Sequence, residues 1–235
     1  MYKTVRYIYF LFVFLFANNS LAQDTNSKNE GDTKYREDQF YVGVTYNILS
    51  SMPSGVNSEG LTGGVNFGFL RDMPINKNRN IAIAVGAGFS FDRYGQNIFI
   101  DIDSEGNTIY TVLESNVSFD SNNIKTGIVE LPIEFRWRSS TPTSYKFWRV
   151  YAGFRLGYTF WNESSFKDSS NSISHTDLED FEKLRLAATM SLGFNKFNFF
   201  VYYSLNPFFN EDAITTNGQE VNFNTIKLGL IFYIL

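Results

Sequence analysis

Apolar and polar residues alternate along much of this chain, in segments of roughly ten residues each. A period of two is typical of a β-strand with two different faces, because successive side chains of a strand point to opposite sides. The pattern recurs in eight segments: 40–49, 61–70, 81–92, 127–138, 148–160, 183–193, 197–205 and 224–235. The sequence therefore predicts an all-β protein of eight antiparallel strands.

The connections between these segments are short and long in turn. The short ones are 71–79, 139–147 and 195–196, and the long ones are 50–60, 93–126, 161–182 and 206–223. This asymmetry predicts an eight-stranded transmembrane β-barrel of the outer membrane, with short periplasmic turns and longer extracellular loops. Both chain ends would then be periplasmic. A further alternation on either side of 103–107 predicts a hairpin that projects beyond the membrane.

One face of the predicted strands is almost purely aliphatic and aromatic, and nearly all strand charges fall on the other face. A soluble β protein, which is the alternative, buries its apolar face, whereas a membrane barrel turns that face to lipid. The chain stops inside the last segment, at 231–235, as outer-membrane barrels usually do. The apolar face also carries rings suited to a membrane interface: Tyr46, Trp137, Tyr158 and Tyr203. We therefore expect the outer-membrane lipid bilayer around the barrel.

Residues 1–22 have the pattern of a cleaved signal peptide. Two basic residues precede the apolar run 7–17, which is too short to span a membrane comfortably, and small residues around Ala22 suit cleavage. An uncleaved anchor is the alternative. The polar stretch 23–38 predicts a flexible periplasmic leader, which leaves 39–235 for the barrel. Export of this kind fits the outer membrane of a Gram-negative bacterium.

Composition narrows the possible chemistry. The chain has no cysteine and one histidine, His175, which excludes disulfides, thiolate metal sites and multi-histidine metal sites. The net charge of −4 argues against nucleic acid as a partner. His175 stands beside Ser174 and Asp177 in one long loop, and such neighbours do not form a catalytic triad. We therefore predict a protein that is not an enzyme and has no cofactor and no metal.

Charged residues on the polar face are predicted to line the lumen. They are Glu130, Glu134, Arg136, Arg138, Arg149, Arg155, Lys183, Arg185 and Lys227. An eight-stranded barrel is filled by its own side chains, and an isolated buried charge is costly. Both glutamates are therefore expected to pair with Arg136, Arg138, Arg155, Arg185 and Lys227. The interpretation is a structural plug of ion pairs, and a small polar conduit or binding cavity is the alternative.

Three consecutive stretches resemble the PorT family, called SprT in gliding bacteria. They are VELPIEFRWR at 129–138, SSTPTSYKFWR at 139–149 and VYAGFRLGY at 150–158. The chain's size, signal peptide, acidic leader and terminal strand are similar to the same family. The resemblance implies an outer-membrane component of the type IX secretion system. Such a component is needed to export sorting-domain cargo, and motility adhesins in gliding species, together with other secretion components.

The predicted short turn around residue 145 is rich in aromatic and basic residues. Tyr145, Lys146, Phe147 and Trp148 are a candidate partner surface, and the alternative is an aromatic girdle at the membrane interface. Two functional alternatives to a secretion role stay open. One is a general small barrel of porin-like, structural or adhesive function. The other is a lipid-modifying enzyme that depends on His175.

Overall fold

The computed structural model describes residues 38–139, 147–195 and 197–234. Eleven strands form within these ranges. They are β1 (Gln39–Ser50), β2 (Gly63–Pro74), β3 (Ile81–Gly95), β4 (Ile98–Ile102), β5 (Thr108–Val112), β6 (Ser121–Arg138), β7 (Trp148–Lys167), β8 (Ser172–Thr176), β9 (Leu184–Phe194), β10 (Phe197–Ser204) and β11 (Asn224–Ile234). No helix in the described part of the chain is long and apolar enough to cross a membrane. The predicted signal peptide and almost all of the predicted leader lie outside the described residues.

Eight of the strands close into an antiparallel barrel, as the alternation predicts. The hydrogen-bonded order is β6, β3, β2, β1, β11, β10, β9, β7, and β7 pairs with β6 to complete the ring. The first and last barrel strands pair from Phe40 with Ile234 to Ser50 with Asn224. Closure leaves no barrel strand edge unpaired, which a bilayer requires because lipid cannot hydrogen-bond to the backbone.

The two faces of the strands differ as predicted for a membrane barrel. Along β1, the side chain of Phe40 is 60% exposed and that of Tyr41 is fully buried, and the alternation continues to the end of the strand. The apolar residues therefore point outward, and the polar residues point into the lumen. This outward apolar face is the one that a membrane barrel turns to lipid.

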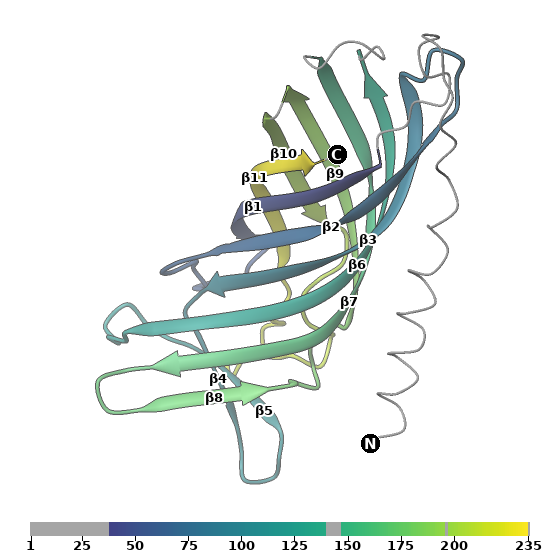
Figure 1. Ribbon diagram of the computed structural model, residues 1–235. Coiled ribbons are helices and arrows are strands. Elements are labelled where there is room, and N and C mark those ends of the chain that lie inside the picture. Colours follow the sequence, from purple (N-terminus) through teal and green to yellow (C-terminus); the bar gives the residue numbers. More distant parts are fainter. Residues whose placement is uncertain (1–37, 140–146, 196, 235) are drawn as a thin grey trace, which may run out of the picture. The chain divides into compact units, whose positions relative to one another are not determined.

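The barrel has two different ends. The connections 75–80, 139–147 and 195–196 define the short-turn end, and those at 51–62, 96–120, 168–183 and 205–223 define the long-loop end. The predicted hairpin is present as β4 and β5. The stretch 161–182, expected to be a loop, is partly strand, because β7 continues to Lys167 and β8 pairs back along it. Figure 1 shows β4, β5 and β8 gathered near that part of β7.

The long loops pack into an apolar cap. It consists of Leu49, Val56, Tyr94, Ile98, Ile100, Tyr110, Ile124, Leu178, Phe181, Phe208, Phe209, Ala213, Val221 and Phe223. Its rings meet closely: the centroid of Phe208 lies 5.1 Å from that of Phe181 and 5.3 Å from that of Phe223. The Tyr110 hydroxyl donates to Asp180 Oδ2 at 3.1 Å, and burial raises the pKa of Tyr110 above its ordinary value. The loops at this end therefore form a packed unit.

Candidate functional site

The structure places eight of the nine predicted lumen charges inside the barrel, buried: Glu130, Glu134, Arg136, Arg138, Arg149, Arg155, Arg185 and Lys227. Lys183 differs from the prediction. It is exposed and precedes β9, which begins one residue later at Leu184. Its backbone carbonyl accepts a hydrogen bond from Thr159, so it ends the ladder instead of lining the lumen. The alternation pattern therefore predicted the wrong location for Lys183, because the residue lies just before the strand begins.

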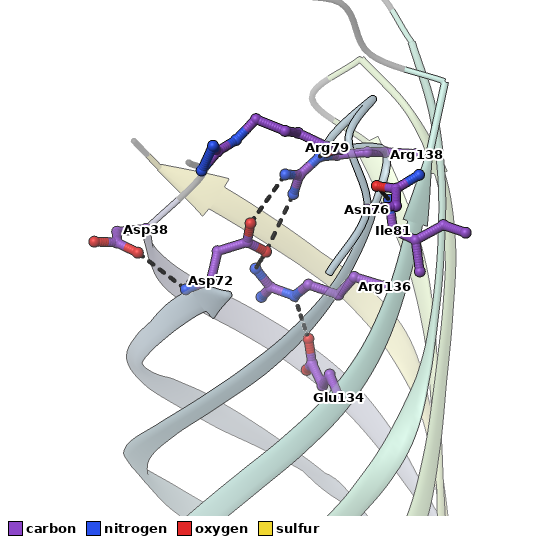
Figure 2. Close-up of polar contacts among 8 residues, drawn as sticks. All are labelled: Asp38, Asp72, Asn76, Arg79, Ile81, Glu134, Arg136 and Arg138. Atoms are coloured by element: carbon purple, nitrogen blue, oxygen red, sulfur yellow. Dashed lines mark hydrogen bonds and ion pairs between the residues drawn. The ribbon is translucent and has the colours of Figure 1, made fainter. Parts of the chain in front are cut away.

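The layer of ion pairs nearest the short-turn end is built around Asp72 (Figure 2). Asp72 Oδ2 accepts from Arg138 Nη2 at 2.9 Å, and its Oδ1 accepts from Arg136 Nη1 at 3.3 Å. Arg136 Nε also donates to Glu134 Oε2 at 3.0 Å, which connects the two carboxylates through one guanidinium. All of these side chains are buried, so each charge is compensated where solvation is weak.

The backbone around this layer is also held. Arg138 Nε donates to the carbonyl of Arg79 in the β2–β3 turn at 3.1 Å. The Asp72 amide donates to Asp38 Oδ1 at 2.9 Å, so the chain entering β1 is fixed beside the layer (Figure 2). Sequence reasoning missed Asp72 because the predicted strand ended at residue 70, whereas β2 continues to Pro74. Extending the alternation by one pair of residues would have placed it in the lumen.

Farther into the barrel, Glu130 forms the predicted pair with a cation. Arg155 Nη1 donates to Glu130 Oε2 at 2.6 Å. The Arg155 guanidinium lies over two rings, 5.2 Å from the centroid of Tyr41 and 4.9 Å from that of Phe200. Together with Tyr202 and Tyr233, these rings make four aromatic side chains from three strands that fill the space beside this pair. The cross-section at this level is occupied by protein.

A third layer joins β11 to β3. Lys227 Nζ donates to Asp92 Oδ2 at 2.5 Å and to Ser90 Oγ at 3.2 Å. Asp92 Oδ1 in turn accepts from Asn47 Nδ2 at 2.9 Å. Asp92 was on the polar face of the predicted strand 81–92, but we expected the glutamates to be the partners of Lys227. Which cation meets which carboxylate depends on the tilt and stagger of the strands, and alternation alone does not give these.

Two of the buried arginines bind backbone carbonyls instead of carboxylates. Arg149 donates to the carbonyl of Asn195, and its guanidinium lies 4.1 Å from the ring centroid of Phe147. Arg185 donates to the carbonyl of Pro207 and lies 4.6 Å from the ring centroid of Phe208 in the cap. The expected pairing of Arg185 with a glutamate is therefore wrong. These two arginines stabilise the connections at opposite ends of the barrel.

The candidate catalytic stretch 174–177 lies on and just after β8. His175 Nε2 lies 2.9 Å from Asp101 Oδ1, so the histidine connects β8 to β4. No hydroxyl group of the described residues hydrogen-bonds to His175, and those residues contain no group of three or more side chains able to hold a metal ion. The described geometry therefore offers no activated nucleophile beside this histidine.

The candidate partner surface is described only in part. Tyr145 and Lys146 lie outside the described residues. Phe147 is buried at the short-turn end, beneath Arg149. Trp148 points outward with 53% of its surface exposed, and its ring lies 5.2 Å from that of Phe194. The structure therefore separates this set: Phe147 is buried against Arg149, and Trp148 belongs to the outer aromatic surface.

A family model and solved structures are similar to this chain. No curated protein matches the chain. The chain is similar to the crystal structure of Ail, the attachment invasion locus protein of Yersinia pestis, at 16% identity and a TM-score of 0.37, covering 84% of this chain and 97% of that one. A second structure of Ail, in complex with the heparin analogue sucrose octasulfate, gives 15% identity, 85% and 99% coverage, and a TM-score of 0.32. The sequence profile described as "Outer membrane protein beta-barrel domain" matches residues 21–210. The chain belongs to this family of outer-membrane β-barrels.

Proposed function

We propose that this barrel is a non-catalytic component of the type IX protein secretion system, of the PorT and SprT type. It would support export of sorting-domain cargo, and of adhesins in gliding species, through contacts with partner proteins. The observation that carries the proposal is the filled lumen, with layers of ion pairs around Asp72, Glu130 and Asp92 and an apolar cap beyond them. A barrel filled in this way acts through its surfaces, because it is too narrow to pass a polypeptide.

The resemblance over 129–158 supports the secretion system as the setting. The orientation proposed with it places the short-turn end and both chain ends in the periplasm, which is the usual arrangement in barrels of this kind. Trp148 and Phe194 then lie at the periplasmic border of the membrane. They offer a partner an aromatic surface held by β7 and β9, which pair directly at these two residues.

A general structural or adhesive barrel is the second candidate, and the apolar cap favours it. Loops that pack around their own core present a fixed surface on the far side of the membrane, as an adhesive protein requires. This reading needs no secretion partner. It predicts normal cargo export in the absence of the protein, together with altered surface binding or altered permeability.

The test of the secretion role is the location of sorting-domain cargo in a strain that lacks the gene. We expect cargo to accumulate in the periplasm while other outer-membrane barrels and membrane permeability stay normal. Complementation with Trp148→Ala is expected to restore export incompletely if Trp148 contacts a partner. Trp137→Ala is the matched control, because Trp137 is also an outward-facing tryptophan near the short-turn end.

The outcomes separate the candidates. If the two tryptophan variants restore export equally well, Trp148 serves only as an interfacial anchor. Normal export in the deletion strain overturns the secretion role and leaves the general barrel. His175→Ala is expected to leave export unchanged, and loss of an activity on lipid in that variant would instead support an enzyme.

A further inference from the structure

The barrel sheet has one strand whose outer edge is unpaired, and that strand is β8. β7 continues to Lys167, well beyond its last partner on β9, and β8 returns along this part of β7. β8 stands last in the strand order, and no described strand pairs with its other edge (Figure 1). No described residue outside β7 hydrogen-bonds to the β8 backbone. β8 is therefore a free strand edge at the long-loop end.

Two hydrogen bonds show which backbone groups of β8 face this edge. The Asp177 amide donates to the carbonyl of Asn162 at 3.1 Å, and the Asp168 amide donates to the carbonyl of Asn171 at 3.0 Å. The facing pairs that flank β8 are thus hydrogen-bonded pairs. Such pairs alternate with non-bonded pairs along an antiparallel ladder. Every second residue of β8 therefore bonds to β7, and the residues between them direct their amides and carbonyls away from it.

The residues that face the edge are Ser172, Ser174 and Thr176, and all three are exposed. Natural proteins protect a free edge with lysine, proline or a β-bulge, because unpaired amides and carbonyls are a template for another strand. β8 contains neither lysine nor proline, and its pairing with β7 has no register shift. The edge is thus open to β-augmentation, in which an extended peptide joins a sheet through its main chain.

The β4–β5 hairpin covers one face of β8 and leaves the edge open. His175 Nε2 lies 2.9 Å from Asp101 Oδ1 on β4. Ile173 stands opposite Phe166, whose ring centroid lies 4.8 Å from that of Phe99 on β4. These contacts hold β8 in its extended conformation before any partner arrives. A preformed edge lowers the entropic cost of binding, since only the partner must become ordered.

The charge around the edge indicates the chemistry of the partner. The four long connections contain fourteen carboxylates and a single cation, Lys183. Asp168 precedes β8, and Asp177 and Glu179 follow it. The last two are exposed and form no ion pair with a described residue. A strand that pairs with β8 approaches a negative surface, which favours basic side chains and disfavours acidic ones.

We propose that β8 binds an extended, basic segment of another protein, which adds a strand to the sheet of β6, β7 and β8. A second copy of this chain in the same bilayer does not fit, because a symmetric pair of edge strands runs antiparallel. All copies in one bilayer share an orientation, so their β8 strands all run back toward the barrel. The inference does not depend on the proposed secretion role.

The test is a titration of the isotope-labelled barrel in detergent with an octapeptide of alternating lysine and valine, followed by nuclear magnetic resonance. We expect the amide signals of Ser172, Ser174 and Thr176 to shift and saturate. A peptide with glutamate in place of lysine is expected to bind about tenfold more weakly, because its charges repel those of the loops. A lysine–valine peptide methylated on every backbone amide is expected not to bind, since it cannot donate to the edge.

Two substitutions of one residue separate the backbone from the side chain. Ser174→Pro removes an amide that faces the edge and does not bond to β7, so we expect the lysine–valine peptide to bind about tenfold more weakly. Ser174→Ala keeps the backbone groups and is expected to bind like wild type. Ser169→Pro is the matched control, because Ser169 is exposed in the turn before β8 and its amide has no described acceptor. Unchanged amide signals of β6 and β7 check that each variant is folded.

The edge is excluded as the binding site if Ser174→Pro binds the lysine–valine peptide as tightly as wild type, or if the fully methylated peptide binds equally well. Equal weakening by Ser169→Pro would also overturn the proposal. Equal binding of the glutamate peptide would overturn the basic character of the partner. The methylated peptide tests the edge in wild type, so the proposal stays falsifiable if Ser174→Pro disturbs β8 itself.

Discussion

At the scale of single residues, the unusual feature of this barrel is the sharing of one carboxylate by two buried arginines. Asp72 accepts from both Arg136 and Arg138, and all three side chains are withdrawn from solvent. Buried ion pairs add little stability compared with well-packed apolar residues, but removing one partner leaves a charge that nothing compensates. Loss of the Asp72 carboxylate would therefore remove part of the charge compensation of Arg136 and Arg138 in a buried site.

Replacement of Asp72 by Asn keeps the size of the side chain and removes its charge. We expect the Asp72→Asn variant to lose about 3–5 kcal/mol of unfolding free energy, because Arg136 and Arg138 each lose a charged acceptor in a buried site. Urea unfolding of the protein in lipid vesicles measures this loss. Asp212→Asn, at an exposed position of the long-loop end, is the control and should change stability by less than about 0.5 kcal/mol. Equal effects of the two variants would contradict the described ion-pair layer.

The lumen residues show what a sequence can and cannot predict at this scale. Alternation placed Glu130 and Lys227 on the inward face, and both are buried there. It did not predict that Lys227 pairs with Asp92 on β3, because their meeting depends on strand order around the barrel and on relative stagger. It also did not predict that Arg185 binds a carbonyl, since loop conformation decides that contact.

At the scale of elements, the long strands with strict alternation were predictable, and the short strand β8 was not. The barrel strands follow the predicted segments because each has one face for lipid and one for the lumen. β8 has five residues and pairs only with the part of β7 that continues beyond the predicted segment. The five residues of β8 contain too little alternation of apolar and polar residues to distinguish a strand from a polar loop. The β4–β5 hairpin was predictable because a turn sequence divides two apolar alternations.

The turn of that hairpin is expected to respond to acid. Asp103 accepts hydrogen bonds from the amides of Glu105 and Asn107, both at 2.8 Å, and from the Asn107 side chain at 3.1 Å. The bonds from Asn107 hold the pKa of Asp103 below its ordinary value of 3.8. A carboxylate with a lowered pKa stabilises the folded turn above its ordinary pKa, and this contribution is lost as the pH falls through the folded value.

Amide hydrogen exchange at Glu105 and Asn107 measures this effect. Their protection should fall once the pH drops below the ordinary 3.8 of an aspartate, and Asp103→Asn should remove this dependence on pH. The turn at Asp168 is an internal control in the same variant. Its carboxylate accepts from the amides of Ser170 and Asn171, which also lower its pKa, so its own response should persist. Unchanged protection of Asn107 in acid would contradict the expectation.

At the scale of the whole barrel, the described structure is filled at three levels and covered at one end. Ion pairs and rings occupy the lumen from Asp72 to Asp92, and the apolar cap packs over the long-loop end. Composition and alternation predicted the filled lumen, since eight strands leave room for little else. They did not predict the cap, because its apolar residues are spread over strand ends, the β4–β5 hairpin and loops that are distant in sequence.

On the proposed function, this protein acts through its surfaces and passes nothing through its lumen. Electrical recording across a planar lipid bilayer that contains the purified, folded barrel tests it most directly. We expect wild type to give no stepwise ionic current, because protein side chains occupy each level of the lumen. Reproducible current steps from wild type would contradict the claim and would favour a porin-like function.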